Sequence, residues 1–136
     1  MALFNSCCKR DCTLYALLIS LLAGIVTGFL HFIGIITLAV PFLWAALGFG
    51  STYLGILPLT LALLRRPVCR CCLCSALNAV LTGLLGTVLL ATALLFFGLA
   101  AADVICALLV GLLAAALALA LGGTACLVRC LADSED

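Results

Sequence analysis

The chain has 136 residues, of which 68% are hydrophobic and only 8% are charged, and its formal net charge is +1. A soluble domain of this length has no interior large enough to bury so much apolar surface, so the composition excludes an ordinary globular protein. In a bilayer, unsatisfied backbone groups are costly, so spanning segments must be helices or a closed barrel. The apolar runs lack the alternation of barrel strands. We therefore predict an all-α integral membrane protein, a four-helix bundle of two hairpins.

The first half of the chain predicts a short terminus followed by one hairpin. Residues 1–12 are rich in cysteine, and residues 13–64 are almost entirely apolar. A helix needs about 20 residues to cross the hydrocarbon core, so this second stretch holds two spans, at about 14–35 and 41–64. Pro41 suits the start of the second span, because the first turn of a helix does not use its missing N–H group.

A polar stretch at 65–74 separates the two halves and contains Arg65, Arg66 and Arg70. After this loop we predict a second hairpin at 75–128, with spans at about 75–98 and 104–128. Residues 129–136 are predicted to form a tail. With this topology all six Lys and Arg residues fall on one side of the membrane. The positive-inside rule then places both termini and the loop in the cytoplasm.

Rows of small residues predict how the spans pack. Helices in lipid associate through small residues that let two backbones approach, since lipid is as apolar as a leucine side chain. Gly24 and Gly28 form a G-x-x-x-G pattern in the first span, and similar rows occur in the last two spans. We predict that these rows form helix interfaces and mediate self-association. The residues are Ser20, Gly24, Gly28, Gly83, Gly86, Gly111, Ala114, Ala118 and Gly122.

Most of the ten cysteines fall on the predicted cytoplasmic side, where thiols are kept reduced. The loop holds two overlapping C-x-x-C pairs, and the small-residue rows of the first and last spans continue into further cysteines. Clustered thiols of this kind can bind zinc, Cu(I) or an iron–sulfur cluster. The candidate metal ligands are Cys8, Cys12, Cys69, Cys71, Cys72, Cys74, Cys126 and Cys130.

The predicted spans contain no Asp, Glu, Lys or Arg in their central parts, which argues against a proton-coupled pump. No phosphate-binding loop, nucleic-acid patch or nucleophile–base motif is visible, so the sequence leans against an enzyme. Our main hypothesis is a non-enzymatic structural or interaction protein whose surroundings are the lipid bilayer and further copies of itself. The alternatives are soft-metal binding at the cysteines and a membrane thiol–disulfide oxidoreductase.

Three stretches of the chain carry a resemblance. Residues 36–44 read ITLAVPFLW, residues 83–87 read GLLGT and residues 126–130 read CLVRC. In order and spacing they resemble a group of small, cysteine-rich, four-span membrane proteins of spore-forming Gram-positive bacteria that have no assigned function. The resemblance implies a location in the bacterial plasma membrane and supplies no activity.

Overall fold

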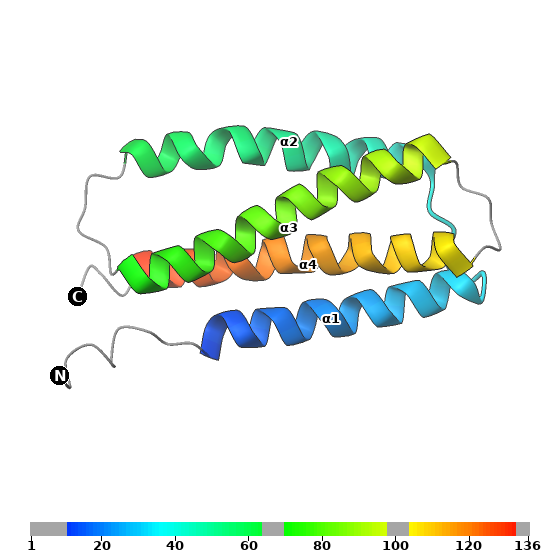
Figure 1. Ribbon diagram of the computed structural model, residues 1–136, viewed down its shortest axis with the longest axis horizontal. Coiled ribbons are helices and arrows are strands. Elements are labelled where there is room, and N and C mark those ends of the chain that lie inside the picture. Colours follow the sequence, from blue (N-terminus) through cyan, green and yellow to red (C-terminus); the bar gives the residue numbers. More distant parts are fainter. Residues whose placement is uncertain (1–10, 64–69, 98–103, 133–136) are drawn as a thin grey trace.

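The computed structural model describes residues 11–63, 70–97 and 104–132, in which all regular secondary structure is α-helical (Figure 1). The helices are α1 (Asp11–Phe32), α2 (Val40–Leu63), α3 (Arg70–Phe97) and α4 (Val104–Ala132). Each is long and apolar enough to cross a membrane. The predicted all-α class with four spanning helices is therefore confirmed.

The helices reach further at the polar end of the bundle than we predicted. Helix α3 begins at Arg70, so residues 70–74 are helical and do not belong to a loop. Helix α4 continues to Ala132, into the predicted tail. Neither extension contains Pro or Gly, and a helix satisfies its own backbone groups where it leaves the hydrocarbon core. The remaining loop and terminal residues lie outside the described ranges.

The order of packing differs from the order of the chain. Helix α4 lies between α1 and α3 and packs closely along both, while α2 packs on α3 (Figure 1). Residues 33–39 join α1 to α2, yet these two helices do not pack against each other. Helices α1 and α2 are therefore joined to each other only by this connection, whereas α3 and α4 pack against each other. The core lies around α4, and α2 contributes the buried Leu43 and Leu57 to it.

The connection between α1 and α2 turns on Gly34, whose φ of 80° is strained for residues with a side chain. The Gly34 amide donates a hydrogen bond to the His31 carbonyl at 3.0 Å. The amides of Ile35 and Ile36 both donate to the Leu30 carbonyl, at 3.1 and 3.4 Å. These bonds close the C-terminus of α1 in the manner of a glycine cap. They hold the chain after Gly34 against the last turn of α1.

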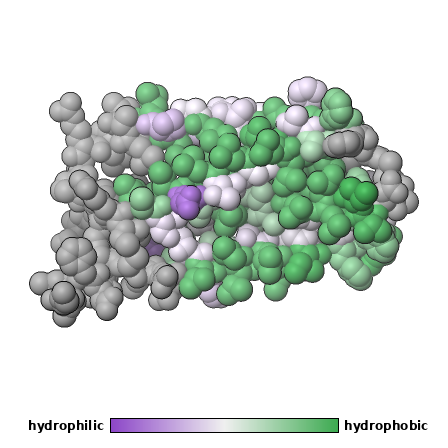
Figure 2. Space-filling model, in the orientation of Figure 1, coloured by the Kyte–Doolittle hydropathy of each residue, from purple (hydrophilic) through white to green (hydrophobic). Residues whose placement is uncertain are grey.

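Large apolar side chains face outward and small ones face inward. Leu22, Leu89 and Phe96 are 67%, 69% and 86% exposed, and Figure 2 shows mainly hydrophobic residues over the described helices. The buried positions include many alanines and glycines, with a few fully buried leucines such as Leu43 and Leu84. This distribution suits a protein whose surroundings are lipid, since outward-facing leucines lose nothing there.

Candidate functional site

Glycines bring α1 and α4 into backbone contact. A Cβ atom added to Gly24 would lie 2.7 Å from the Gly111 carbonyl oxygen and 2.8 Å from the Ala115 Cβ. A Cβ atom added to Gly111 would lie 2.8 Å from the Gly24 carbonyl oxygen. Real Cβ atoms essentially never come within 3.0 Å of such neighbours, so these approaches require glycine. The contact is therefore specific to the residues at these positions.

A second set of glycines joins α3 to α4. A Cβ atom on Gly83 would lie 2.6 Å from the Ala120 amide nitrogen and 2.8 Å from the Ala116 carbonyl oxygen. One on Gly86 would lie 3.2 Å from the Ala116 Cβ. Helix α4 thus presents one small-residue face to α1 and another to α3, and both neighbours are held at backbone distance.

The structure places the other predicted packing residues as follows. An added Cβ on Gly28 would lie 3.1 Å from the Ala107 carbonyl oxygen, and one on Gly122 would lie 2.8 Å from the Ala16 Cβ. Ser20 is also buried. Gly28, Gly122 and Ser20 therefore belong to the same α1–α4 layer as Gly24 and Gly111.

Ala114 and Ala118 are half-buried, but they are not among the nearest neighbours of the interface glycines. The close contacts of α4 use Gly111 and Ala115 toward Gly24, and Ala116 and Ala120 toward Gly83. The row that approaches α1 most closely thus contains the predicted Gly111, with Ala115 in place of the predicted Ala114.

A disulfide joins Cys12 in α1 to Cys126 in α4, with a Cα–Cα distance of 6.0 Å and a sequence separation of 114. The small-residue layer leads directly to this bond, because Ala16, one turn after Cys12, contacts Gly122, one turn before Cys126. Both cysteines belong to an apolar cluster at this end of the bundle. The bond therefore closes the α1–α4 interface covalently, at the end that carries Arg129.

The oxidised state corrects our expectation of reduced thiols at this end. Cys12 and Cys126 are bonded to each other, and Cys130 is also disulfide-bonded. A sulfur in a disulfide is not the thiolate that a soft metal requires, so these three residues cannot serve as ligands in this state. Cys74, at the start of α3, is an exposed free thiol.

The predicted metal site is not assembled in the described part of the chain. No group of three or more His, Cys, Asp or Glu residues is placed there to hold one ion. The ligand candidates that fall outside the described residues or side chains are Cys8, Cys69, Cys71 and Cys72. For these four positions the metal hypothesis stays a prediction.

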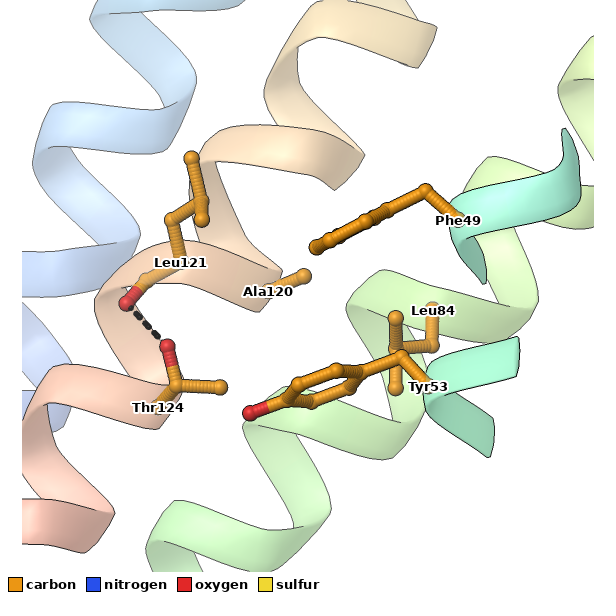
Figure 3. A pocket seen from close by; sticks show the side chains of 6 residues that line it. All are labelled: Phe49, Tyr53, Leu84, Ala120, Leu121 and Thr124. Atoms are coloured by element: carbon orange, nitrogen blue, oxygen red, sulfur yellow. Dashed lines mark hydrogen bonds between the residues drawn. The ribbon is translucent and has the colours of Figure 1, made fainter. Parts of the chain in front are cut away.

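A small cavity of about 40 Å³ lies between α2, α3 and α4 (Figure 3). Its lining residues are Phe49, Tyr53, Leu84, Ala120, Leu121 and Thr124. The Thr124 hydroxyl donates to the Leu121 carbonyl at 2.7 Å, and the rings of Phe49 and Tyr53 stack with centroids 5.7 Å apart. Such a volume holds a few water molecules, whereas pockets for organic ligands measure about 300 Å³ or more.

At the other end of the bundle, Cys106 meets His31. The Cys106 Sγ lies 3.8 Å from the His31 Nε2, and the His31 Nδ1 lies 2.8 Å from the Ile36 carbonyl oxygen. A carbonyl oxygen can only accept, so Nδ1 carries the proton and Nε2 is the acceptor that faces the thiol. Cys106 is a free cysteine and only 7% exposed. The three groups form a thiol, a base and a carbonyl that orients the base.

No nucleophile–base motif is visible in the sequence, because the members of this pair are separated by 75 residues and meet only when α1 packs on α4. Two signals in the sequence could have indicated it. His31 is the single histidine of the chain, and Cys106 is the cysteine that lies far from the polar end. The hairpin topology places both at the same end.

Comparisons of this chain with protein-family models, with curated proteins and with solved structures found no match.

Proposed function

We propose that this chain is a structural and interaction protein of the membrane, which self-associates through one face of α2. The support is a row of small residues on α2, namely Gly48, Ser51, Thr52 and Gly55, all of which are exposed. The interface glycines of α1, α3 and α4 are occupied within the bundle. The α2 row is therefore a small-residue face that remains available to a second copy.

The chemistry of this row suits contact between helices in lipid. Added Cβ atoms on Gly48 and Gly55 would meet nothing within 4 Å, so both glycines face open space. The hydroxyls of Ser51 and Thr52 both donate to the Gly48 carbonyl, at 3.1 and 2.6 Å. With their hydrogen bonds satisfied inside the helix, these residues leave a smooth surface that another backbone can approach.

Replacing Gly55 with leucine is expected to reduce self-association by about 10-fold or more, which corresponds to a loss of about 1.4 kcal/mol. The added side chain keeps a second backbone away, and the fold is preserved because no atom lies within 4 Å of the new Cβ. The matched control is Ala125→Leu, which places the same leucine side chain on an exposed position of α4. Fluorescence energy transfer between labelled copies in vesicles measures the self-association of both variants. An unchanged Gly55→Leu signal, or an equal loss in the control, would contradict the proposal.

We place the protein in the plasma membrane with its polar end in the cytoplasm, because Arg70 begins α3 and Arg129 lies in the last turn of α4, at the same end of the bundle. Cys74 is an exposed thiol at that end and serves as a reporter. We expect an impermeant maleimide to label Cys74 only after cells are permeabilised. Labelling of Cys74 in intact cells would contradict this orientation and place the polar end outside the cell.

Thiol–disulfide exchange is a second candidate function, which the Cys12–Cys126 bond favours. The Ser75 hydroxyl donates to the Thr13 hydroxyl at 3.3 Å, so the neighbours of Cys74 and Cys12 in the chain touch each other. A free thiol and a disulfide thus share one end of the bundle, as exchange requires. Forming the Cys12–Cys126 bond from two thiols releases two electrons, and in a membrane oxidoreductase a lipid-soluble quinone would accept them. Reoxidation of the reduced pair in vesicles should then depend on added quinone. A rate that is independent of quinone would remove this candidate.

Soft-metal binding, as zinc, copper or an iron–sulfur cluster, has less support. Its remaining thiol candidates are Cys8, Cys69, Cys71, Cys72 and Cys74. Metal analysis of protein purified without oxygen tests it, and a result of zero equivalents would exclude it.

A further inference from the structure

The surroundings of Cys106 decide which reagents can reach its thiol. Cys106 lies in the first turn of α4 and packs in an apolar cluster with Leu94 and Val110. Its neighbours in the chain, Val104 and Ile105, are 60% and 72% exposed on the outer surface of the bundle. A helix end in this position lies near the boundary between hydrocarbon and headgroups. A reagent that reaches this thiol from the membrane must therefore be lipophilic.

The partners of Cys106 indicate a nucleophile. The thiol donates its hydrogen bond to the His31 Nε2, and the His31 Nδ1–H is held by the Ile36 carbonyl oxygen. Since that carbonyl belongs to the turn at Gly34, the imidazole has a fixed tautomer and a fixed orientation. A thiol with an oriented imidazole base is the arrangement that activates cysteine for attack on carbonyl carbon.

We propose that Cys106 is a site of S-acylation, in which His31 acts as the general base and the donor is a long-chain fatty acyl ester or thioester. The Cys106 Sγ attacks the acyl carbonyl carbon while its proton passes to the His31 Nε2. A C–S bond forms, the C–O or C–S bond to the leaving group breaks, and His31 returns the proton to the departing oxygen or sulfur. The products are an S-acyl cysteine and a free alcohol or thiol, and no oxidant or reductant is needed.

The apolar surroundings fit the product as well as the donor. On the His31 side of the pair, Phe32 and Ile35 are 59% and 68% exposed, so an acyl chain that leaves Cys106 past His31 meets an apolar outer surface. The packing around Cys106 leaves it 7% exposed, which keeps water away from a thioester. The acyl chain would then lie among lipid chains beside α4.

The experiment uses the full chain, purified and placed in phospholipid vesicles. In one arm the vesicle phospholipid carries an alkyne-tagged palmitoyl ester, and in the other arm alkyne-tagged palmitoyl-CoA is added. Mass spectrometry of peptides, before and after treatment with hydroxylamine, locates the adduct. Label on Cys106 from the first arm assigns a membrane lipid as the donor, and label from the second arm alone assigns a soluble thioester.

The expected result is acylation of Cys106 that His31→Asn slows by about 100-fold or more, since a positioned general base contributes about 10²–10⁴-fold. Asparagine can still donate a hydrogen bond to the Ile36 carbonyl, and the Cys12–Cys126 disulfide reports that the variant has folded. Cys74→Ala is the matched control and should acylate Cys106 at the rate of the unmodified chain.

Several results would overturn the proposal: no adduct on Cys106 from either donor, an unchanged rate in His31→Asn, or adducts only on other cysteines. A zinc or copper ion with an imidazole ligand, detected by X-ray absorption, would also overturn the proposal. Because His31 is the single histidine of the chain, this result would assign the His31–Cys106 pair to a metal site.

Discussion

Replacing Gly111 with leucine is expected to separate α1 from α4, to lower the free energy of unfolding by more than about 3 kcal/mol, and to prevent the Cys12–Cys126 disulfide. An added Cβ at Gly111 would lie 2.8 Å from the Gly24 carbonyl oxygen and 3.3 Å from the Gly28 Cα. These neighbours are backbone atoms, which cannot rotate away as a flexible side chain can. Relief of the clash therefore requires the two helices to move apart, which also carries the cysteines apart.

Electrophoresis without reductant measures how completely the disulfide forms. Reversible unfolding in mixed micelles measures the free energy of unfolding. Ala125→Leu is the control, because Ala125 is exposed on the same helix and lies outside the α2 face proposed for self-association. We expect the control to retain the disulfide and its stability. If Gly111→Leu formed the disulfide as completely as the unmodified chain, the close α1–α4 interface would be wrong.

Loss of the disulfide itself, by Cys12→Ser, is expected to lower the free energy of unfolding by about 2–4 kcal/mol. The bond closes a loop across 114 residues, which restricts the unfolded chain strongly. In a membrane the unfolded chain keeps its helices, so the effect falls below the value of about 4.7 kcal/mol that chain entropy alone gives for a 100-residue loop.

Cys74→Ser controls for the substitution, since Cys74 is exposed and free. Unfolding curves with and without reductant complete the comparison. Reductant should lower the stability of the unmodified chain at least to that of Cys12→Ser, because reductant also breaks the disulfide of Cys130. Equal stability of Cys12→Ser and the unmodified chain would contradict a structural role for the bond.

The helices could be predicted from the sequence because a bilayer permits few solutions for a long apolar run. The order in which the helices pack could not be predicted from the sequence. Small residues occur on several faces of each span, and a shift of one position turns a face by about 100° around the helix axis. This is why Ala114 and Ala118 were predicted where Ala115 makes the close contact with Gly24. The absence of packing between α1 and α2 likewise has no signature in the composition of either helix.

The candidate sites were predictable in different degrees. The small-residue rows point toward Cys12 and Cys126, but residue spacing carries no information on whether a cysteine is oxidised. The arginines favour a cytoplasmic location for this end, whereas a stable disulfide is typical of an oxidising compartment. The His31–Cys106 pair depends on two helices that are distant in the chain, so only the packed structure brings its atoms together.

The most direct test of the account is disulfide mapping of the native protein, digested from membranes after free thiols have been blocked and without reductant. The arrangement of α1 against α4 predicts a linked peptide pair that contains Cys12 and Cys126, together with Cys106 as a free, blocked thiol. A linkage that involves Cys106, or a pairing of Cys12 with a cysteine other than Cys126, would contradict it.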